Sequence, residues 1–99
     1  MRKGLLEYCI LFIISRSEAY ASDILETLKK AELLVVEGTL YPLLTRMKNE
    51  GLLAYRWQES TGGPPRKYYT LTPEGEQLLA QLQEEWQSIC QAVNQVTNQ

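Results

Sequence analysis

The spacing of the apolar residues changes at Gly51, and this change limits the folds that the chain can adopt. Before it, four apolar residues recur at i, i+3, i+4 and i+7, which predicts a helix over residues 38–50 with one buried face. These four are Leu40, Leu43, Leu44 and Met47. After it, Leu53, Tyr55 and Trp57 alternate with polar or small residues, which predicts a strand. A helical part followed by an extended part is therefore expected, with the glycine ending the helix.

A β-hairpin leading into a C-terminal helix is expected in the second half of the chain. The alternating run is followed by a Gly- and Pro-rich turn over residues 60–65 and by a second strand over residues 67–72, rich in aromatic and β-branched side chains. Thr72 then caps the last helix, and Pro73 takes its first position. The hairpin thus has a tip flanked by basic residues.

Two further helices are expected ahead of the hairpin. Residues 3–16 are apolar nearly all round, so this helix must be buried on several sides, one of which a partner chain would cover. Ser22 or Asp23 is expected to cap the second helix, which runs to about Ala31. In the third helix, Pro42 fits only in the first turn, where no helical hydrogen bond needs its missing N–H.

The last helix carries the most regular pattern in the chain. Six apolar residues are spaced 3, 4, 3, 4 and 3 apart, which is a heptad seam. The seam consists of Leu79, Leu82, Trp86, Ile89, Val93 and Val96. It could pack onto its own domain, but it is longer than a three-helix unit can cover. We therefore expect a homodimer whose interface also includes Leu5, Cys9 and Phe12 of the first helix.

The charge distribution is uneven along the chain. The net charge is −2 and the isoelectric point is near 5.1, which argues mildly against nucleic-acid binding. Residues 1–36 are balanced, whereas residues 37–72 carry five basic against three acidic side chains. Residues 73–99 carry four glutamates and no basic residue. The middle of the chain can therefore be locally positive despite the acidic total.

Composition disfavours catalysis and metal binding. The chain has no histidine, which excludes Ser-His and Cys-His nucleophile pairs and histidine metal ligands. Its two cysteines, Cys9 and Cys90, lie far apart on apolar stretches and are expected to be buried free thiols. Glu84 and Glu85 are adjacent, so on a helix they point in different directions and form no acid/base pair. We expect no enzyme, no cofactor and no metal.

The order helix, helix, helix, basic hairpin, helix is that of a winged helix-turn-helix. In such proteins the second helix of the motif enters the DNA major groove, which here is the helix over residues 38–50. The expected DNA-binding residues lie on its outward face and on the hairpin. They are Thr39, Tyr41, Pro42, Thr45, Arg46, Asn49, Arg66 and Lys67. Each has a structural alternative, such as an aromatic brace for Tyr41 or a solvated charge for Arg46 and the hairpin cations.

Several segments together resemble the PadR-like family of bacterial winged-helix regulators. They are Gly-Thr-Leu-Tyr-Pro-Leu-Leu at 38–44, Glu-Gly-Leu at 50–52, Gly-Pro-Pro-Arg-Lys-Tyr-Tyr-Thr-Leu-Thr-Pro-Glu-Gly at 63–75, and the opening Arg-Lys-Gly at 2–4. The resemblance implies a dimeric repressor of a pseudo-palindromic operator, with a single C-terminal dimerisation helix. It also implies release by a small aromatic effector, for which Trp86 would form one wall of the pocket. The family often has Gly-Tyr-Gly-Tyr where this chain has Ala-Tyr-Ala-Ser at 19–22, so a DNA contact from Ser22 is in doubt.

The resulting expectation is a mainly α fold with a small β-hairpin, a winged helix-turn-helix plus a long C-terminal dimerisation helix. Residues 1–74 would form the DNA-binding domain and residues 75–99 the dimerisation helix, as one compact unit. The expected function is sequence-specific transcriptional regulation in the cytoplasm, with operator DNA and a second copy of the chain as partners. The alternative is a winged-helix protein–protein interaction module that does not bind DNA.

Overall fold

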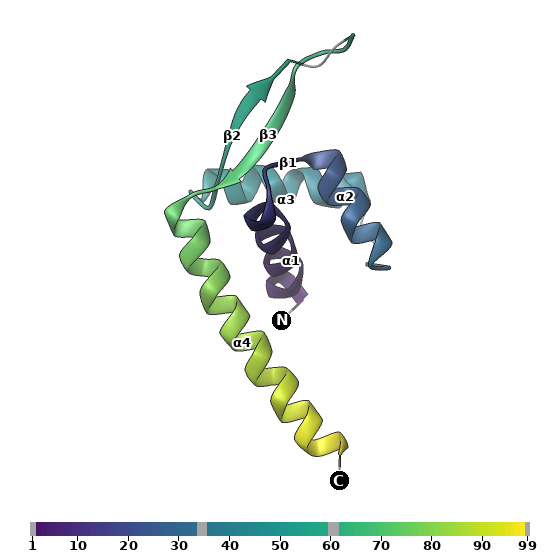
Figure 1. Cartoon of the computed structure of the whole chain (residues 1–99), viewed down its shortest axis with the longest axis vertical. Helices are drawn as coiled ribbons and strands as arrows, with labels where there is room; N and C mark the ends of the chain where they lie inside the picture. Colours follow the sequence, from purple (N-terminus) through teal and green to yellow (C-terminus); the bar gives the residue numbers. More distant parts are fainter. Residues whose placement is uncertain (1, 34–35, 60–61, 99) are drawn as a thin grey trace.

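The computed structural model describes residues 2–33, 36–59 and 62–98 of the chain. The expected fold class is confirmed, with four helices around a small antiparallel sheet (Figure 1). In chain order the elements are α1 (Arg2–Arg16), β1 (Ala19–Tyr20), α2 (Ala21–Lys30), α3 (Glu37–Asn49), β2 (Leu53–Gln58), β3 (Arg66–Leu71) and α4 (Pro73–Thr97). The first two residues of the expected hairpin turn, 60 and 61, lie outside the described residues.

The sheet contains a short strand that the sequence pattern did not predict. β3 lies between β2 and β1 and pairs antiparallel with both. β1 pairs Ala19 with Tyr69 and Tyr20 with Tyr68 across the sheet. A strand of two residues is too short to show the alternation by which strands are recognised. Its effect is to hold the chain extended directly before α2.

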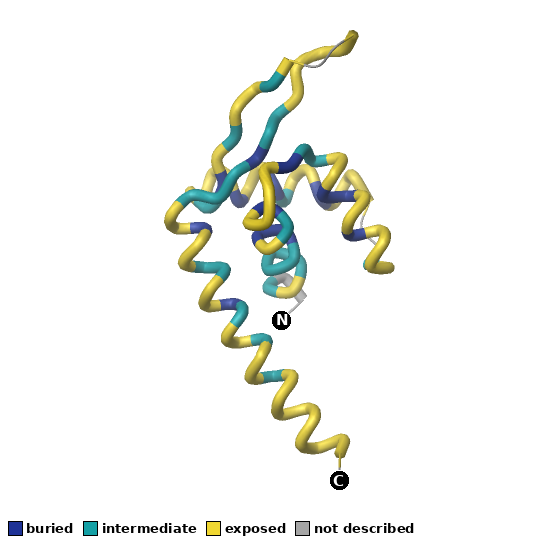
Figure 2. Tube along the Cα trace, in the orientation of Figure 1, coloured by how far each residue is buried: buried dark blue, intermediate teal, exposed yellow. Residues whose placement is uncertain are grey.

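The core lies where α1, α2, α3 and the sheet meet. Figure 2 shows the buried segments gathered there, with α1 in the middle. The innermost side chains come from all three helices: Ile10, Leu11, Ile24, Leu28, Leu40, Leu44 and Met47. In α3 they lie on the face that the helical periodicity predicted to be inward, whereas the nearly all-round apolar character of α1 did not single out Ile10 and Leu11. α1 is not buried all round, however, because Leu5 and Phe12 remain exposed.

The expected start of α2 was wrong by two to three residues. Its N-cap is Tyr20, with extended backbone dihedral angles, rather than Ser22 or Asp23. Asp23 instead lies in the first turn, where its carboxylate accepts a hydrogen bond from the Tyr20 N–H at 3.1 Å. Pairing of β1 with β3 keeps Tyr20 extended, so the helix begins as soon as the strand ends.

The expected position of Pro42 was also wrong. α3 begins at Glu37, so Pro42 is its sixth residue and lies beyond the first turn. At this place the missing N–H leaves the carbonyl of Gly38 without its helical partner. Both residues are on the exposed side of α3, where water can hydrogen-bond to that carbonyl.

The start of α4 confirms the predicted cap. The Thr72 hydroxyl oxygen accepts a hydrogen bond from the Gly75 N–H at 3.0 Å, and Pro73 is the first helical residue. The same hydroxyl donates to the carbonyl of Gly51 at 2.6 Å. Thr72 therefore ties the start of α4 to the turn between α3 and β2, and this connection positions the hairpin beside α3.

Candidate nucleic-acid interface

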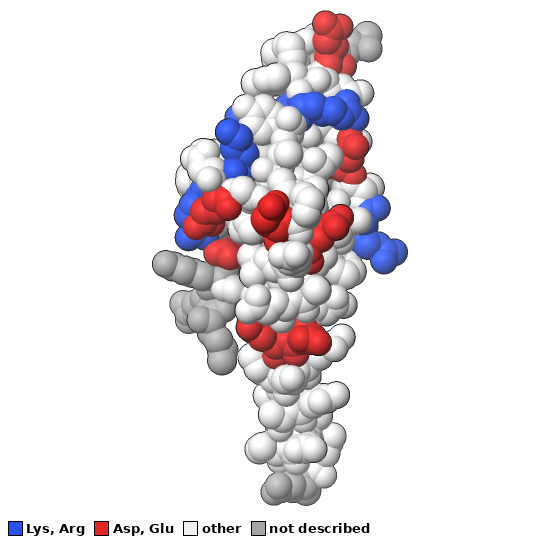
Figure 3. Space-filling model, turned by 90° about the vertical axis from the view of Figure 1, so that its left-hand side faces the viewer, with Lys and Arg blue, Asp and Glu red and all other residues white. Residues whose placement is uncertain are grey.

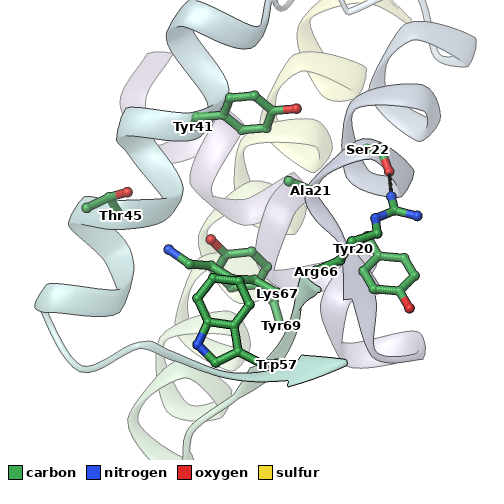
Figure 4. A pocket seen from close by; sticks show the side chains of 9 residues that line it. All are labelled: Tyr20, Ala21, Ser22, Tyr41, Thr45, Trp57, Arg66, Lys67 and Tyr69. Carbon is green, nitrogen blue, oxygen red and sulfur yellow. Dashed lines mark hydrogen bonds between the residues drawn. The ribbon is translucent and has the colours of Figure 1, made fainter. Parts of the chain in front are cut away.

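A groove lies between α3 and the hairpin, closed at one end by the start of α2. Figure 4 shows side chains of α3 and of the hairpin facing each other across it. The lining residues are Tyr20, Ala21, Ser22, Tyr41, Thr45, Trp57, Arg66, Lys67 and Tyr69. The groove thus combines aromatic rings, hydroxyls and two cations, and it brings together residues from five elements.

Most of the predicted residues of α3 lie on its exposed side. Tyr41 is 42% exposed and Thr45 lines the groove beside it. Asn49 and Thr45 also line a smaller hollow near the end of α3, together with Tyr55 of the hairpin. Thr39 and Pro42 are exposed as well, so all five remain accessible to a ligand.

Arg46 lies on the flank of α3, away from the groove. Its guanidinium donates a hydrogen bond at 2.5 Å to the carboxylate of Glu7, a half-buried residue of α1. An ion pair between helices that are far apart in sequence is outside the reach of periodicity arguments. The structure thus ties this predicted DNA-binding side chain to the helix that was expected to form the dimer.

The two cations of β3 rest on aromatic rings on opposite sides of the hairpin base. The Arg66 guanidinium lies 3.9 Å from the ring centre of Tyr20 and donates a hydrogen bond to the Ser22 hydroxyl. The Lys67 ammonium lies 4.7 Å from the ring centre of Tyr55 and 5.6 Å from that of Trp57. Such cation–π contacts restrict where each cation points.

A third cation, Arg56, makes its contacts on the outer face of the hairpin. Arg56 of β2 forms an ion pair with Glu18 at 2.7 Å and lies 5.0 Å from the ring centre of Tyr68. This contact joins the hairpin to the segment just before β1. Arg56 is opposite Tyr68 in the strand register and Arg66 lies two residues before Tyr68, so both arginines contact the region around the start of α2 from the same outer face of the hairpin.

Tyr69 lies buried at the base of the groove and stays protonated. Burial raises the pKa of its phenol above the ordinary 10.0, and the neighbouring phenols of Tyr55 and Tyr41 raise it further. A neutral hydroxyl at this place adds no negative charge to the groove. The groove therefore keeps the positive character that Lys67 and Arg66 give it.

Positive charge gathers on the half of the molecule that carries this groove. In the view of Figure 3, Lys and Arg side chains lie over the upper half together with several acidic ones, whereas the lower part of α4 shows acidic side chains only. The whole of α4 contains four glutamates and no basic residue. The segregation expected from the sequence is thus present in three dimensions.

Sequence reasoning missed the contribution of the hairpin's aromatic residues. Trp57 is 61% exposed and lines the groove, although it was treated only as a strand residue. Tyr20 and Ser22 were likewise not assigned to the site, yet both hold Arg66. The alternation of β2 carried a usable signal for Trp57, since Tyr55 and Trp57 must share one face.

The predicted seam of α4 divides into two parts. Leu82 is buried, and Leu79 and Trp86 pack against the same core, so this half lies against its own chain. Val93 and Val96 are 52% and 69% exposed, and the far end of α4 extends away from the body (Figures 1 and 2). The near half of the seam therefore packs on its own domain, which was the alternative to a dimer interface.

An apolar groove between α1 and α2 includes two of the residues expected at the dimer interface. Cys9 and Phe12 line it, and Leu5 is exposed one turn away on α1. Cys9 is half-buried, but Cys90 is exposed, so the expectation of two buried thiols was wrong for Cys90. Its side of α4 does not pack against the body of the chain.

Two kinds of feature are absent from the described residues. Among residues 2–33, 36–59 and 62–98, no helix combines the length and apolarity needed to cross a membrane. In the same part of the chain, no three His, Cys, Asp or Glu side chains are grouped so that they could hold a metal ion.

Comparison with known proteins agrees on one family. The model of the PadR-like family of transcriptional regulators matches residues 10–81. A PadR-like transcription factor from Bacteroides fragilis is 58% identical, with a TM-score of 0.84, covering 97% of this chain and 93% of that one. A PadR-like transcriptional regulator from Bacillus cereus is 38% identical, with a TM-score of 0.86, covering 98% of this chain and 95% of that one.

Two further relatives extend the comparison. PadR from Bacillus subtilis, solved in complex with operator DNA, is 28% identical with a TM-score of 0.71, covering 78% of this chain and 44% of that one. An uncharacterized protein from Lysinibacillus sphaericus is 30% identical over 96 residues, which is 93% of this chain and 87% of the relative. The similarity to the full-length matches therefore includes nearly all of the fold described above.

Proposed function

The chain belongs to the PadR-like family of transcriptional regulators, which are not enzymes, and on this premise we propose that it is a repressor that binds a pseudo-palindromic operator as a homodimer. The observation that carries the proposal is the groove between the exposed face of α3 and the cationic base of the hairpin. The solved complex of the Bacillus subtilis relative with operator DNA supports the same class of ligand.

In the proposed complex, α3 lies in the major groove. Tyr41, Thr45 and Asn49 offer hydrogen-bonding groups to base edges or phosphates from its exposed face. Thr39 and Pro42 lie on the same side, where their small size allows the helix to approach the duplex closely. Because α3 is only 13 residues long, about 20 Å, a single α3 reads one half-site.

The cations of the site contribute in different ways. Lys67 lines the groove and binds a phosphate directly. Arg46 and Arg66 each hold an intramolecular partner, but a guanidinium has five N–H donors, so both can also bind a phosphate while keeping that partner. Glu7 and Ser22 then fix the direction from which these arginines reach the DNA.

The homodimer follows from the apolar surface that a single chain leaves uncovered. Val93 and Val96 of α4, and Leu5 and Phe12 of α1, are exposed in the single chain. We propose that a second copy covers them and brings the two α3 helices about one DNA turn apart, roughly 34 Å. In this arrangement residues 1–74 bind DNA and residues 75–99 hold the dimer, in the cytoplasm where the operator is.

A small aromatic effector would act at the dimer interface. Trp86 is half-buried against the core of its own chain, at the middle of the α4 seam, so its remaining surface faces the proposed partner. An indole in this position offers a planar apolar surface for an aromatic ligand. Quenching of Trp86 emission by planar aromatic compounds, measured in a Trp57→Phe background, tests this part of the proposal.

The experiment for the main proposal is a gel shift on the DNA upstream of the protein's own gene, across a salt series. We expect the affinity to fall by about a thousandfold between about 50 and 200 mM salt, because a dimer that engages about six phosphates releases their counterions. An affinity that does not change with salt would contradict the proposal. Absence of any shift at low salt, together with a stoichiometric protein partner, would instead favour an interaction module.

A further inference from the structure

Trp57 presents its indole to the groove from the inner face of the hairpin. Its side chain is 61% exposed, whereas Tyr69, two strand positions from its cross-strand partner, is buried. The indole meets the Tyr55 ring edge-on, with centroids 5.9 Å apart and ring planes at 87°. A tryptophan in this position leaves a large apolar surface in water, which is unfavourable unless a ligand covers it.

A cation stands beside this indole on the same face. Lys67 is directly opposite Trp57 in the strand register, and its ammonium lies over both the Tyr55 and Trp57 rings. In Figure 4 the ammonium end of Lys67 points toward α3. The inner wall of the hairpin therefore offers an apolar plane and a positive charge side by side.

The opposite wall belongs to the helix that we place in the major groove. Tyr41 and Thr45 of α3 face Trp57 and Lys67 across the groove. A duplex with α3 in its major groove runs one sugar–phosphate strand between α3 and the hairpin. That strand alternates an apolar deoxyribose with an anionic phosphate, which matches an indole followed by an ammonium.

We propose that Trp57 packs against a deoxyribose of the DNA backbone while Lys67 binds the adjacent phosphate. The hairpin then holds DNA through a contact that does not depend on base sequence and that has an apolar as well as an ionic part. This inference rests on the proposed function, and it adds a DNA-contacting residue that neither the motif nor the charge pattern indicated.

The test compares single variants on two duplexes, the upstream DNA and a random-sequence duplex of equal length. Trp57→Ala is expected to weaken binding to both duplexes by the same factor, about tenfold, because a deoxyribose is present at every position. Its slope of log affinity against log salt stays at the wild-type value, since an apolar contact releases no counterions. Lys67→Gln is expected to reduce the magnitude of that slope by about 0.9 for each Lys67–phosphate contact that is lost.

Lys30→Gln is the matched control for Lys67→Gln. Lys30 is an exposed residue at the end of α2 that forms an ion pair with Glu26, so its loss removes one positive charge without touching the groove. We expect the salt slope of this variant to stay close to that of the wild type. A fall equal to that of Lys67→Gln would show that net charge alone matters and would overturn the role given to Lys67.

A measurement on the wild-type sequence avoids any question of misfolding. The chain is labelled with 5-fluorotryptophan, and the two fluorine resonances are assigned by their presence or absence in Trp57→Phe. On addition of the random-sequence duplex, the Trp57 resonance is expected to shift, and the Trp86 resonance to stay in place, because Trp86 lies on α4 away from the groove.

The outcomes separate this inference from the proposed function. Wild-type protein that binds neither duplex overturns the proposed function itself. Wild-type binding that Trp57→Ala leaves within about twofold, or a Trp57 resonance that does not shift, overturns only the backbone contact. A loss confined to the upstream DNA means that Trp57 contacts bases, and this result also overturns the inference.

Discussion

At the scale of single residues, Gly75 is the position where the structure leaves least room. A Cβ atom at Gly75 would lie 2.1 Å from the carbonyl oxygen of Leu52, a distance that no real contact shows. The neighbouring backbone cannot easily yield, because the same carbonyl accepts a hydrogen bond from the Thr72 N–H at 3.2 Å. Gly75 thus allows α4 to begin in contact with the turn that follows α3.

Gly75→Ala is therefore expected to destabilise the fold by about 3 kcal/mol, since the backbone must move to admit one methyl group. Urea unfolding followed by circular dichroism measures the change. Gly38→Ala is the control: no atom lies within 4 Å of its Cβ position, and an exposed helical alanine should raise stability by about 0.5 kcal/mol. Equal stability of both variants would contradict the close approach at Gly75.

Cys9 is the residue whose titration the fold alters. Burial raises the pKa of its thiol above the ordinary 9.0, because the thiolate loses hydration. The folded state holds this proton more tightly than the unfolded state. The stability that Cys9 contributes is therefore fully present below about pH 9 and is lost as pH rises through the higher folded pKa.

We expect the alkylation of Cys9 by iodoacetamide to be slow at about pH 8, since only the thiolate reacts. In a Cys90→Ser variant, the alkylation rate should rise with pH in both states. The curve of the native protein should lie at higher pH than that of the urea-unfolded chain. Mass spectrometry of the modified peptide gives both curves. Superimposed curves would show that burial does not affect this thiol.

At the scale of elements, the capping residue Thr72 decides how α4 meets the rest of the fold. Its hydroxyl satisfies one N–H of the first turn and also reaches the Gly51 carbonyl. A single side chain thus joins the end of one element to the start of another. Because the hairpin enters α4 at this point, the angle of the hairpin over α3 depends on it.

Thr72→Ala is expected to cost about 1 to 2 kcal/mol, because the cap and the second hydrogen bond are lost together. Thr72→Ser keeps the hydroxyl and should lose only a small part of this. Thermal unfolding of the three proteins at equal concentration compares them. If the alanine and serine variants unfold at the same temperature, the hydroxyl does not stabilise the fold.

At the scale of the whole molecule, the fold is more elongated than a compact domain with this number of residues. Its radius of gyration is 15.2 Å, against about 13 Å for a compact domain of this length. The longest dimension is 57 Å and runs from the hairpin at one end to the far end of α4, which extends beyond the body, at the other (Figure 1). A helix that leaves its apolar end outside the core gains little from its own chain, which supports the proposed homodimer.

The double variant Val93→Glu with Val96→Glu is expected to yield a folded monomer. Both residues are exposed in the single chain, so charge there costs the monomer little, whereas burying it between two chains is strongly unfavourable. Sedimentation across a concentration range measures the mass. Gln91→Glu with Gln95→Glu adds the same charge off the seam and should leave the dimer intact. A double valine variant that remains dimeric would contradict the proposed interface.

The difference between what was predictable and what was not appears in particular residues. The helical face of α3, the hairpin strands and the Thr72 cap followed from the sequence, because each depends on residues within one or two turns of each other. The missed strand β1 and the misplaced N-cap of α2 share one cause. Both depend on the pairing of Tyr20 with Tyr68, which lies far away in the sequence.

For this protein, local periodicity and composition determined the order of the helices and hairpin strands, the inward face of α3 and the separation of basic from acidic segments. The tertiary structure alone decided which side chains the arginines hold: Arg46 meets Glu7 across 39 residues, and Arg66 meets Ser22 across 44. It also decided that Trp57 faces α3. The physical reason is that an ion pair or a groove needs two segments brought together by the packing of the core, whereas a helix face needs only its own repeat.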